Sequence, residues 1–235
     1  MTTAPQDCPA GHHPPVRLAV RTVPAEPPPE TASRPEELRH AERYRSRPAA
    51  VRYLWRRLTA RRLVAAAADC GPAEVELLRT PAGPLRVECR GRPAGLTVSV
   101  SQSRDWTACA VGVEPLGLDI ERHRPAGPPP PPGLPAAVLH PEELRAAGEP
   151  DWPALLRHWT LKEALAKATG HGIGGGGLTE VRVDPDAPGD SLRSAGRWAA
   201  PGEWSVWALD LGVPVAAALA LPRRDCPHPP PLRPL

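Results

Sequence analysis

Two acidic residues and a Glu–Lys pair are the side chains in this sequence best suited to chemistry on a phosphate. Asp119 and Glu121 lie two residues apart in Gly-Leu-Asp-Ile-Glu, and on a β-strand both carboxylates would point to one face. Glu163 and Lys167 lie four residues apart in a helical pattern, so they share one helix face. Three carboxylates on rigid elements would form a site for a hard cation such as Mg²⁺, which prefers oxygen ligands and keeps positions for water and phosphate.

Each pair also has a purely structural interpretation. Glu163 and Lys167 could form an ordinary helix ion pair, which contributes only ~0.3–0.5 kcal/mol, and their spacing alone favours that interpretation. The carboxylates of Asp119 and Glu121 could pair with Arg122 or Arg124, which follow on the same segment. The spacing of the residues leaves these alternatives open.

The two lysines of the chain lie in the same helical segment. The chain has 29 Lys and Arg residues, and Lys162 and Lys167 are its only lysines. An ammonium group is a compact donor with a point charge, whereas a guanidinium is a broad planar fork. The segment 162–167 is therefore the first candidate for chemistry that requires an ammonium group.

The composition excludes several classes of protein. The 235 residues suffice for one large domain or two small ones, and a hydrophobic fraction of 41% supports a folded core. A formal charge of +3 is too small to indicate a nucleic-acid-binding protein. No apolar run reaches the ~18 residues of a membrane span. We therefore expect a globular protein without a nucleic-acid or membrane partner.

The N-terminus and the cysteines indicate where the protein works. The first residues show no basic start followed by an apolar stretch, so no secretory signal is predicted. The five cysteines form no Cys-x-x-Cys pair and are odd in number. We interpret them as reduced thiols of a cytoplasmic protein, not as a disulfide framework or a zinc site.

Helices and short strands alternate in an order that predicts an α+β fold. Residues 35–47 and 49–68 read as helices separated at Pro48. Further helices begin near Pro141 and over 153–169, the latter with Asp151 as N-cap and Gly170 at its end. The expected strands are 16–20, 74–78, 85–89, 96–100, 106–113, 116–121, 178–183, 204–209 and 213–221, with 106–113 and 116–121 forming a hairpin around Glu114-Pro115.

The order of elements, helix then strands, occurs roughly twice and predicts two similar α+β halves that meet near residue 115. Residues 125–135 contain five consecutive prolines and form a stiff linker. The expected division is a Pro-rich N-terminal segment (1–33), an N-terminal half (34–115), a C-terminal half with the metal site (116–221) and a loose Pro-rich tail (222–235).

The joint pattern of motifs resembles the 4′-phosphopantetheinyl transferases, in particular the type that activates surfactin synthetase. Asp-Ile-Glu is followed some forty residues later by Trp-Thr-Leu-Lys-Glu-Ala, and the Lys-Glu-Ala form places the sequence nearer the KEA branch than the Lys-Glu-Ser branch. Three other segments, in the matching order, also resemble that family: the Arg-rich helix after Arg43-Tyr44, Gly91-Arg92-Pro93, and Ser101-Gln102-Ser103 followed by Trp106.

The resemblance implies a pseudo-dimer of two α+β halves, with coenzyme A and Mg²⁺ in the cleft between them. Such enzymes transfer the phosphopantetheine arm of coenzyme A to a serine of an acyl or peptidyl carrier protein, and we expect a monomer. By position, the magnesium ligands would be Asp119, Glu121 and Glu163, with Glu163 also as the base. Lys167 would donate to the phosphate, with help from Lys162. Arg52, Arg92, Ser101 and Gln102 would bind coenzyme A phosphates.

One residue departs from the family pattern. Gln102 stands where the family has a histidine between two serines, and glutamine cannot carry charge. The alternative function is therefore a non-catalytic or weakly active relative that binds coenzyme A or a carrier protein. Arg104 could compensate for the loss.

The Arg-rich segment 34–62 also has two interpretations. It holds ten arginines and three glutamates. Such a run is usually a solvated helix face. Here it could equally be a surface for phosphates or for an acidic partner, such as the acidic recognition helix that the resemblance implies for the carrier protein.

Overall fold

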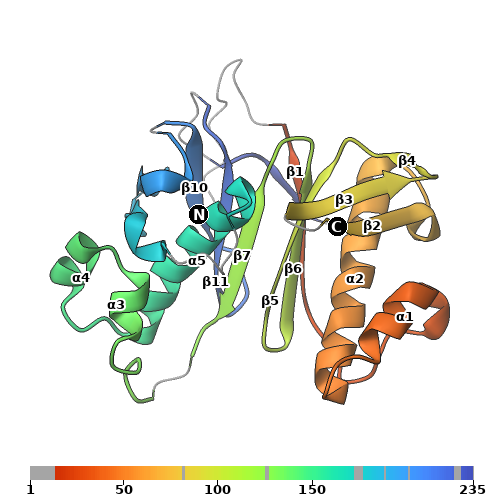
Figure 1. Ribbon diagram of the computed structural model, residues 1–235, viewed down its shortest axis with the longest axis horizontal. Coiled ribbons are helices and arrows are strands. Elements are labelled where there is room, and N and C mark those ends of the chain that lie inside the picture. Colours follow the sequence, from red (N-terminus) through yellow and green to blue (C-terminus); the bar gives the residue numbers. More distant parts are fainter. Residues whose placement is uncertain are drawn as a thin grey trace.

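Two β-sheets packed against each other form the centre of the α+β fold (Figure 1). The computed structural model describes residues 14–80, 83–124, 127–171, 177–187, 189–200, 202–224 and 229–234. The fold class predicted from the sequence is confirmed. The first sheet has the order β12-β1-β6-β5 and the second β10-β11-β7; their strands are β1 Val16–Thr22, β5 Thr97–Ser103, β6 Trp106–Gly112, β7 Gly117–Arg122, β10 Trp204–Leu209, β11 Val215–Pro222 and β12 Leu232–Pro234.

The alternation of side chains along each strand separates the inner from the outer face of each sheet. Ala108 and Ala110 of β6 lie in a core shared with Leu118 and Ile120 of β7. Cys109, between the two alanines, belongs instead to the core on the other face of the first sheet. Successive side chains of a strand point to opposite faces, and those of β6 are buried on both faces, as expected for a strand covered on both sides.

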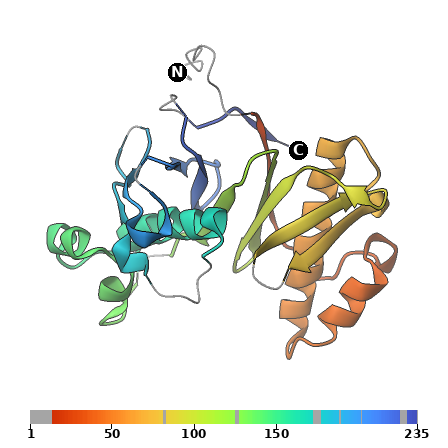
Figure 2. The ribbon, with the colours of Figure 1, turned by 45° about the horizontal axis from the view of Figure 1, so that its top comes forward.

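A long helix covers the outer face of each sheet (Figures 1 and 2). Helix α2, Arg47–Ala68, packs Leu63 and Val64 into the core of the first sheet. Helix α5, Trp152–Thr169, packs Leu161 and Leu165 against β10 and β11. The resulting layers are helix, sheet, sheet and helix.

The predicted ends of α5 are confirmed. The Asp151 carboxylate accepts a hydrogen bond of 2.8 Å from the backbone N–H of Ala154, which satisfies one of the donors exposed at a helix N-terminus. Gly170 has a φ of 76° at the C-terminus, a left-handed conformation that glycine adopts without steric cost. Helix α5 is therefore fixed at both ends, and Glu163 and Lys167 lie in its last two turns.

The two halves of the chain show the same order of elements and the same order of strands. In each half a first strand precedes the long helix, two hairpins follow, and the last strand pairs with the first: β1-β6-β5 in one sheet and β7-β11-β10 in the other. The remaining elements are α1 Pro35–Ala41, β2 Val75–Thr80, β3 Gly83–Cys89 and β4 Arg92–Pro93 in the first half, and α3 Leu134–Val138, α4 Pro141–Ala147, β8 Arg182–Val183 and β9 Leu192–Ser194 in the second.

The predicted hairpin around Glu114-Pro115 is wrong. Strand β6 is already paired on both edges, with β1 and with β5, so it has no free edge for the strand that follows. Strand β7 crosses to the second sheet and pairs with β11. The passage from the first sheet to the second therefore lies between Gly112 and Gly117.

Three smaller expectations also need correction. Helix α1 ends at Ala41, and Pro48 lies in the first turn of α2 instead of between two adjoining helices, because the first turn tolerates a residue without an N–H. Residues Leu178–Glu180 form a 3₁₀ turn before the short strand β8, in place of one strand over 178–183. The tail contains β12, which pairs in parallel with β1.

Two further findings concern the length and polarity of the helices and the state of the cysteines. None of the helices in the described ranges is long and apolar enough to cross a membrane. Cys70, Cys89 and Cys109 are free thiols, whereas Cys8 and Cys226 lie outside the described residues.

Gly117 lets α5 approach β7 closely. A Cβ atom built at this position would lie 1.9 Å from the Ala164 carbonyl oxygen and 2.6 Å from the Ala168 nitrogen. Both are backbone atoms of the helix, so a side chain would displace α5 instead of rotating away. The absence of a side chain here sets the distance between the strand that carries Asp119 and the helix that carries Glu163.

We predict that Gly117→Ala destabilises the protein by about 3 kcal/mol, because the added methyl group forces α5 away from the sheet. Urea denaturation measures the change. Gly71→Ala is the matched control, since its Cβ meets the nearest atom at an ordinary 3.4 Å and its φ is −74°. Equal stabilities of the two variants would show that the close approach is not a constraint.

Candidate active site

Three serines of β5 join the two sheets where their edges meet. Each hydroxyl oxygen accepts a hydrogen bond from a backbone N–H of β7, so side chains replace the backbone pairing of an ordinary sheet. We call these three serines the serine ladder. Its bonds run from Leu118 N to Ser99 (2.9 Å), from Ile120 N to Ser101 (3.2 Å) and from Arg122 N to Ser103 (3.0 Å).

The serine ladder also holds the two carboxylates of β7. The Ser101 hydroxyl donates to Asp119 Oδ1 at 2.7 Å, and the Ser103 hydroxyl donates to Glu121 Oε2 at 2.6 Å. A serine hydroxyl has one hydrogen and two lone pairs, so it can donate to a carboxylate while it accepts from the backbone. The same bonds that connect the sheets therefore fix the orientation of both acidic side chains.

Lys167 brings the last turn of α5 to the same place. Its Nζ atom donates to Asp119 Oδ1 at 2.6 Å and to the Leu118 carbonyl at 3.1 Å. The cation thus pairs with a carboxylate 48 residues away in sequence, and not in the simple i, i+4 helix pair with Glu163 that was the structural alternative.

The arginines proposed as partners of the β7 carboxylates have other contacts. Arg122 forms an ion pair with Asp105 at 3.0 Å, and the guanidinium of Arg124 lies 3.5 Å from the centre of the Trp152 ring. Neither arginine neutralises Asp119. Lysine and the serine ladder hold the carboxylates instead.

Glu163 is buried and has unsatisfied oxygens. Its residue is only 1% exposed, and within the described residues neither carboxylate oxygen has a hydrogen-bond partner. Burial raises the pKa of Glu163 to about 7, and repulsion from Asp119 and Glu121 adds to the shift while the Lys167 ammonium opposes it. Removal from water disfavours the charged form, so this carboxyl group titrates near neutral pH.

The other two carboxyl groups are shifted in the same direction. Burial raises the pKa of Asp119, against the opposing effect of Lys167. Burial also raises the pKa of Glu121, against the hydrogen bond from Ser103. Three acidic groups therefore lie together in a partly desolvated place, where Lys167 opposes the shift of each pKa and Arg124 also opposes that of Glu121.

The unpartnered carboxylate oxygens suit a magnesium ion, because such an ion usually takes only some of its ligands from the protein. In the described residues, no three His, Cys, Asp or Glu side chains are arranged to hold a metal ion. However, Asp119 Oδ2 and both oxygens of Glu163 are buried without a partner. Mg²⁺ is usually held by one or two carboxylates plus water and substrate phosphates, so these donors suit it.

A cavity lined by arginines opens on the other side of β5. Its volume is about 820 Å³. Gln102 lies between two members of the serine ladder, and its side chain points to the opposite face of the strand, toward α2. Guanidinium forks bind phosphate oxygens bidentately. The cavity is therefore suited to a polyanion, and its arginines are Arg52, Arg56, Arg104 and Arg122.

Lys162 does not reach this region, which corrects its predicted contact with coenzyme A. Its side chain is 0% exposed. The Nζ atom donates to Glu143 Oε2 at 2.6 Å and to the Val138 carbonyl at 2.7 Å. The other Glu143 oxygen accepts from the Val183 N–H. The hydrogen bonds of Lys162 and Glu143 thus connect α3, α4 and β8 to α5, and the role of Lys162 is structural.

Two other predicted phosphate ligands differ in position. The Ser101 hydroxyl is buried, and its hydrogen is used by Asp119, so the prediction that it binds a phosphate is corrected to one of positioning. Arg92 lies on β4 with an exposed side chain and is not part of the arginine cavity. Arg52 and Gln102 do line that cavity together.

Several residues of the site escaped the sequence analysis. No role was predicted for Ser99 of the serine ladder or for Arg56 of the arginine cavity. Ser103, Arg104 and Arg122 were predicted in other contexts: in a family motif, as compensation for Gln102 and as a partner of the acidic residues. The serines did leave a signal, since they recur with a period of two in Ser-Val-Ser-Gln-Ser. Arg56 left none, because arginine is common throughout this chain.

Comparisons with known proteins find similarity to one family over part of the chain. Residues 115–220, just under half of the chain, match the profile of the 4′-phosphopantetheinyl transferase superfamily. A Synechocystis protein provisionally named a 4′-phosphopantetheinyl transferase is 30% identical over 154 residues, which cover 63% of this chain and 61% of the relative. The 4′-phosphopantetheinyl transferase HetI of Nostoc is 32% identical over 124 residues, or 47% of this chain and 51% of HetI. The chain thus spans less than two thirds of either relative.

Glu163→Gln should change how stability depends on pH in metal-free buffer. A carboxyl group whose pKa rises from 4.5 to about 7 on folding binds its proton more tightly in the folded state. Its contribution is complete below pH 4.5 and is lost as the pH rises to about 7. The free energy of unfolding of the unmodified protein should therefore fall over this range relative to Glu163→Gln, as measured by urea denaturation with EDTA.

The matched control is Glu142→Gln, which removes an exposed carboxylate that pairs with Arg182. It should follow the unmodified protein at every pH. A constant difference between Glu163→Gln and the unmodified protein from pH 4.5 to 7 would contradict the raised pKa.

Proposed function

We propose that the chain transfers phosphopantetheine from coenzyme A to a serine of an acyl or peptidyl carrier protein, because residues 115–220 match the profile of the 4′-phosphopantetheinyl transferase superfamily. The observation that carries the proposal is the meeting of Asp119, Glu163 and Lys167 between β7 and α5, inside the matched region. In the reaction, the serine oxygen bonds to the phosphorus next to pantetheine. The bond to the other phosphate breaks, and adenosine 3′,5′-bisphosphate leaves.

Asp119 and Glu163 would hold a magnesium ion through their unpartnered oxygens, with Glu121 as the third predicted ligand. A bound Mg²⁺ neutralises charge on the pyrophosphate and orients it. The chain itself supplies the orientation of these ligands, because Ser101 and Ser103 fix two of the carboxylates.

Glu163 is the base that we propose for the carrier serine. Its carboxyl group has two oxygens, so one could hold Mg²⁺ while the other accepts the proton as a general base. Its oxygens have no competing hydrogen-bond donor among the described residues. The proton of the serine hydroxyl would move to one of these oxygens as the new P–O bond forms.

Lys167 would donate to the phosphate from a fixed position. Two of its three hydrogens are directed to Asp119 and to the Leu118 carbonyl. The third is left for a phosphate oxygen. The two protein contacts hold the ammonium in place, so little side-chain entropy would be lost when the substrate binds.

The arginine cavity would take the nucleotide phosphates of coenzyme A. Arg52 and Gln102 line it as the resemblance implied, and Arg56, Arg104 and Arg122 add further donors. Arg122 directly follows Glu121, so a ligand in the cavity would lie beside the carboxylates. The exposed arginines Arg39, Arg43 and Arg45, on α1 and the turn after it, would face an acidic carrier protein.

We also propose that the two halves form a pseudo-dimer and that the chain is of the surfactin-synthetase-activating type. The repeated strand order, β1-β6-β5 and β7-β11-β10, supports the first point. The Lys-Glu-Ala sequence at 162–164 supports the second. The proposed site lies where the halves meet, at β5 and β7.

A second candidate is a relative that binds coenzyme A without transferring its arm. The observation in its favour is Gln102, which provides no charge in the arginine cavity. The first candidate is favoured because the acidic residues and Lys167 converge, which mere binding of coenzyme A would not require.

We predict that Asp119→Asn lowers transfer by at least about 100-fold, since a metal-binding carboxylate contributes several kcal/mol to phosphoryl transfer. The protein is mixed with apo carrier protein, coenzyme A and Mg²⁺, and the carrier is weighed by mass spectrometry. Asp186→Asn, which alters an exposed carboxylate paired with Arg157, should leave the rate unchanged. Coenzyme A binding with no transfer by the unmodified protein would support the second candidate.

We predict that Gln102→His tightens coenzyme A binding several-fold at pH 6, where the imidazole carries charge, because a charged hydrogen bond exceeds a neutral one by about 1 kcal/mol. Titration calorimetry measures the dissociation constant. If the affinity does not rise, Arg104 already supplies the charge. In that case Arg104→Gln alone should weaken coenzyme A binding, and adding Gln102→His to Arg104→Gln should restore it.

A further inference from the structure

Strand β1 has an edge that is only partly covered. Strand β12 pairs with Val16 to Leu18 and extends no further along β1, whereas β6 pairs with β1 through Thr22 on the other side. The N–H of Val16 donates toward β12, to the Pro231 carbonyl. Because backbone groups alternate along a strand, those of Val20 and Thr22 point to the same side, where no strand of the described residues pairs with them.

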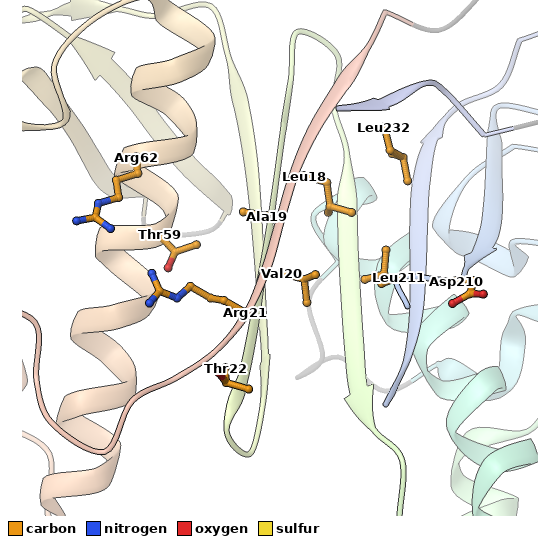
Figure 3. A pocket seen from close by; sticks show the side chains of 10 residues that line it. All are labelled: Leu18, Ala19, Val20, Arg21, Thr22, Thr59, Arg62, Asp210, Leu211 and Leu232. Carbon is orange, nitrogen blue, oxygen red and sulfur yellow. The ribbon is translucent and has the colours of Figure 1, made fainter. Parts of the chain in front are cut away.

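A groove of about 570 Å³ runs along this open edge and has two chemically different walls (Figure 3). Arg21 points toward Thr59 and Arg62 of α2, which form a basic wall. Leu18 and Val20 point to the other side of β1, toward Leu211 and Leu232. Neighbouring residues of the strand thus face a basic wall and an apolar wall in turn.

The basic wall has charge and hydrogen-bonding capacity that are not used within the described residues. No carboxylate there forms an ion pair with Arg21 or Arg62, and the Thr59 hydroxyl, on a residue only 4% exposed, has no hydrogen-bond partner. The Arg21 guanidinium is held 4.5 Å from the centre of the Trp55 ring. Burial and the nearby Arg62 charge lower the pKa of Arg21, as expected for like charges close together.

Of the described residues that line the groove, Asp210 is the one acidic residue, and it does not neutralise this wall. In Figure 3 it lies beside Leu211, across β1 from the arginines. Its carboxylate accepts a hydrogen bond from the backbone N–H of Gly212. The basic wall therefore lacks an acidic partner among the described residues.

We propose that this edge binds an extended peptide segment of another protein as an added strand, with acidic residues alternating with apolar ones. The backbone of the peptide would pair with Val20 and Thr22. Its acidic side chains would meet Arg21, Arg62 and the Thr59 hydroxyl, and its apolar side chains would meet Leu211 and Leu232. Strand addition obtains affinity from main-chain hydrogen bonds and specificity from alternate side-chain pockets.

Charge complementarity selects an acidic partner, and the period of two along β1 sets its pattern. The edge is separate from the candidate active site, because β6 lies between β1 and β5 in the sheet. Both places can be occupied at once, so the inference does not depend on the proposed transferase activity.

The probe is a fluorescein-labelled peptide of eight residues that alternates valine and glutamate, with fluorescence anisotropy of the full chain as the readout. We expect saturable binding. Replacement of every glutamate by lysine should abolish it. N-methylation of the alternate amides that face β1 should also abolish binding, whereas N-methylation of the other amides should not. Equal binding of the acidic and lysine peptides, or no binding of either, would overturn the proposal.

Two variants test the basic wall. Arg21→Gln combined with Arg62→Gln should weaken binding of the acidic peptide by about tenfold or more, since charge-assisted hydrogen bonds are lost. Arg86→Gln, which removes an exposed arginine of β3 that pairs with Glu88, should have no effect. Circular dichroism verifies folding. An unchanged affinity of the folded double variant would overturn the proposal, as would sedimentation showing that the edge is instead occupied by a second copy of the chain.

Discussion

The serine ladder is the interaction on which the rest of the candidate site depends. In an ordinary sheet, the N–H groups of Leu118 and Ile120 would pair with backbone carbonyls, and no side chain would stand between the strands. Here a hydroxyl occupies that place and satisfies a backbone donor and a carboxylate at once. The junction between the two sheets and the positioning of Asp119 are therefore the same set of bonds, and a change in one must alter the other.

The separation of charge across one strand follows from the same geometry. Ser101 and Ser103 of β5 hold the acidic side chains of β7, while Gln102 faces the arginine cavity on the other side. A buried carboxylate costs free energy when it is charged, and more so beside other carboxylates, which explains why the pKa of Glu163 rises. The phosphates of a ligand would neutralise the arginines of the cavity, and a cation that comes with it would neutralise the carboxylates. This complementarity supports the function we propose.

Local sequence patterns were sufficient to place the acidic residues on their elements but not to choose their partners. The period of two put Asp119 and Glu121 on one face of a strand, and the helix caps fixed α5 around Glu163. The hairpin at Glu114-Pro115 failed because a turn signal does not reveal that β6 has no free edge. Lys162 was assigned to the site by the family resemblance, whereas its buried partner Glu143 belongs to another helix. Such pairings are set by packing between distant segments.

Hydrogen exchange at the amides of β7 tests the central claim most directly. If the Ser101 hydroxyl is the acceptor of the Ile120 N–H, Ser101→Ala should accelerate exchange of that amide in two-dimensional NMR spectra. The amides of Leu118 and Arg122, held by Ser99 and Ser103, should keep most of their protection. Unchanged protection of Ile120 in the folded variant would contradict the claim that serine side chains join the two sheets and orient the acidic residues between them.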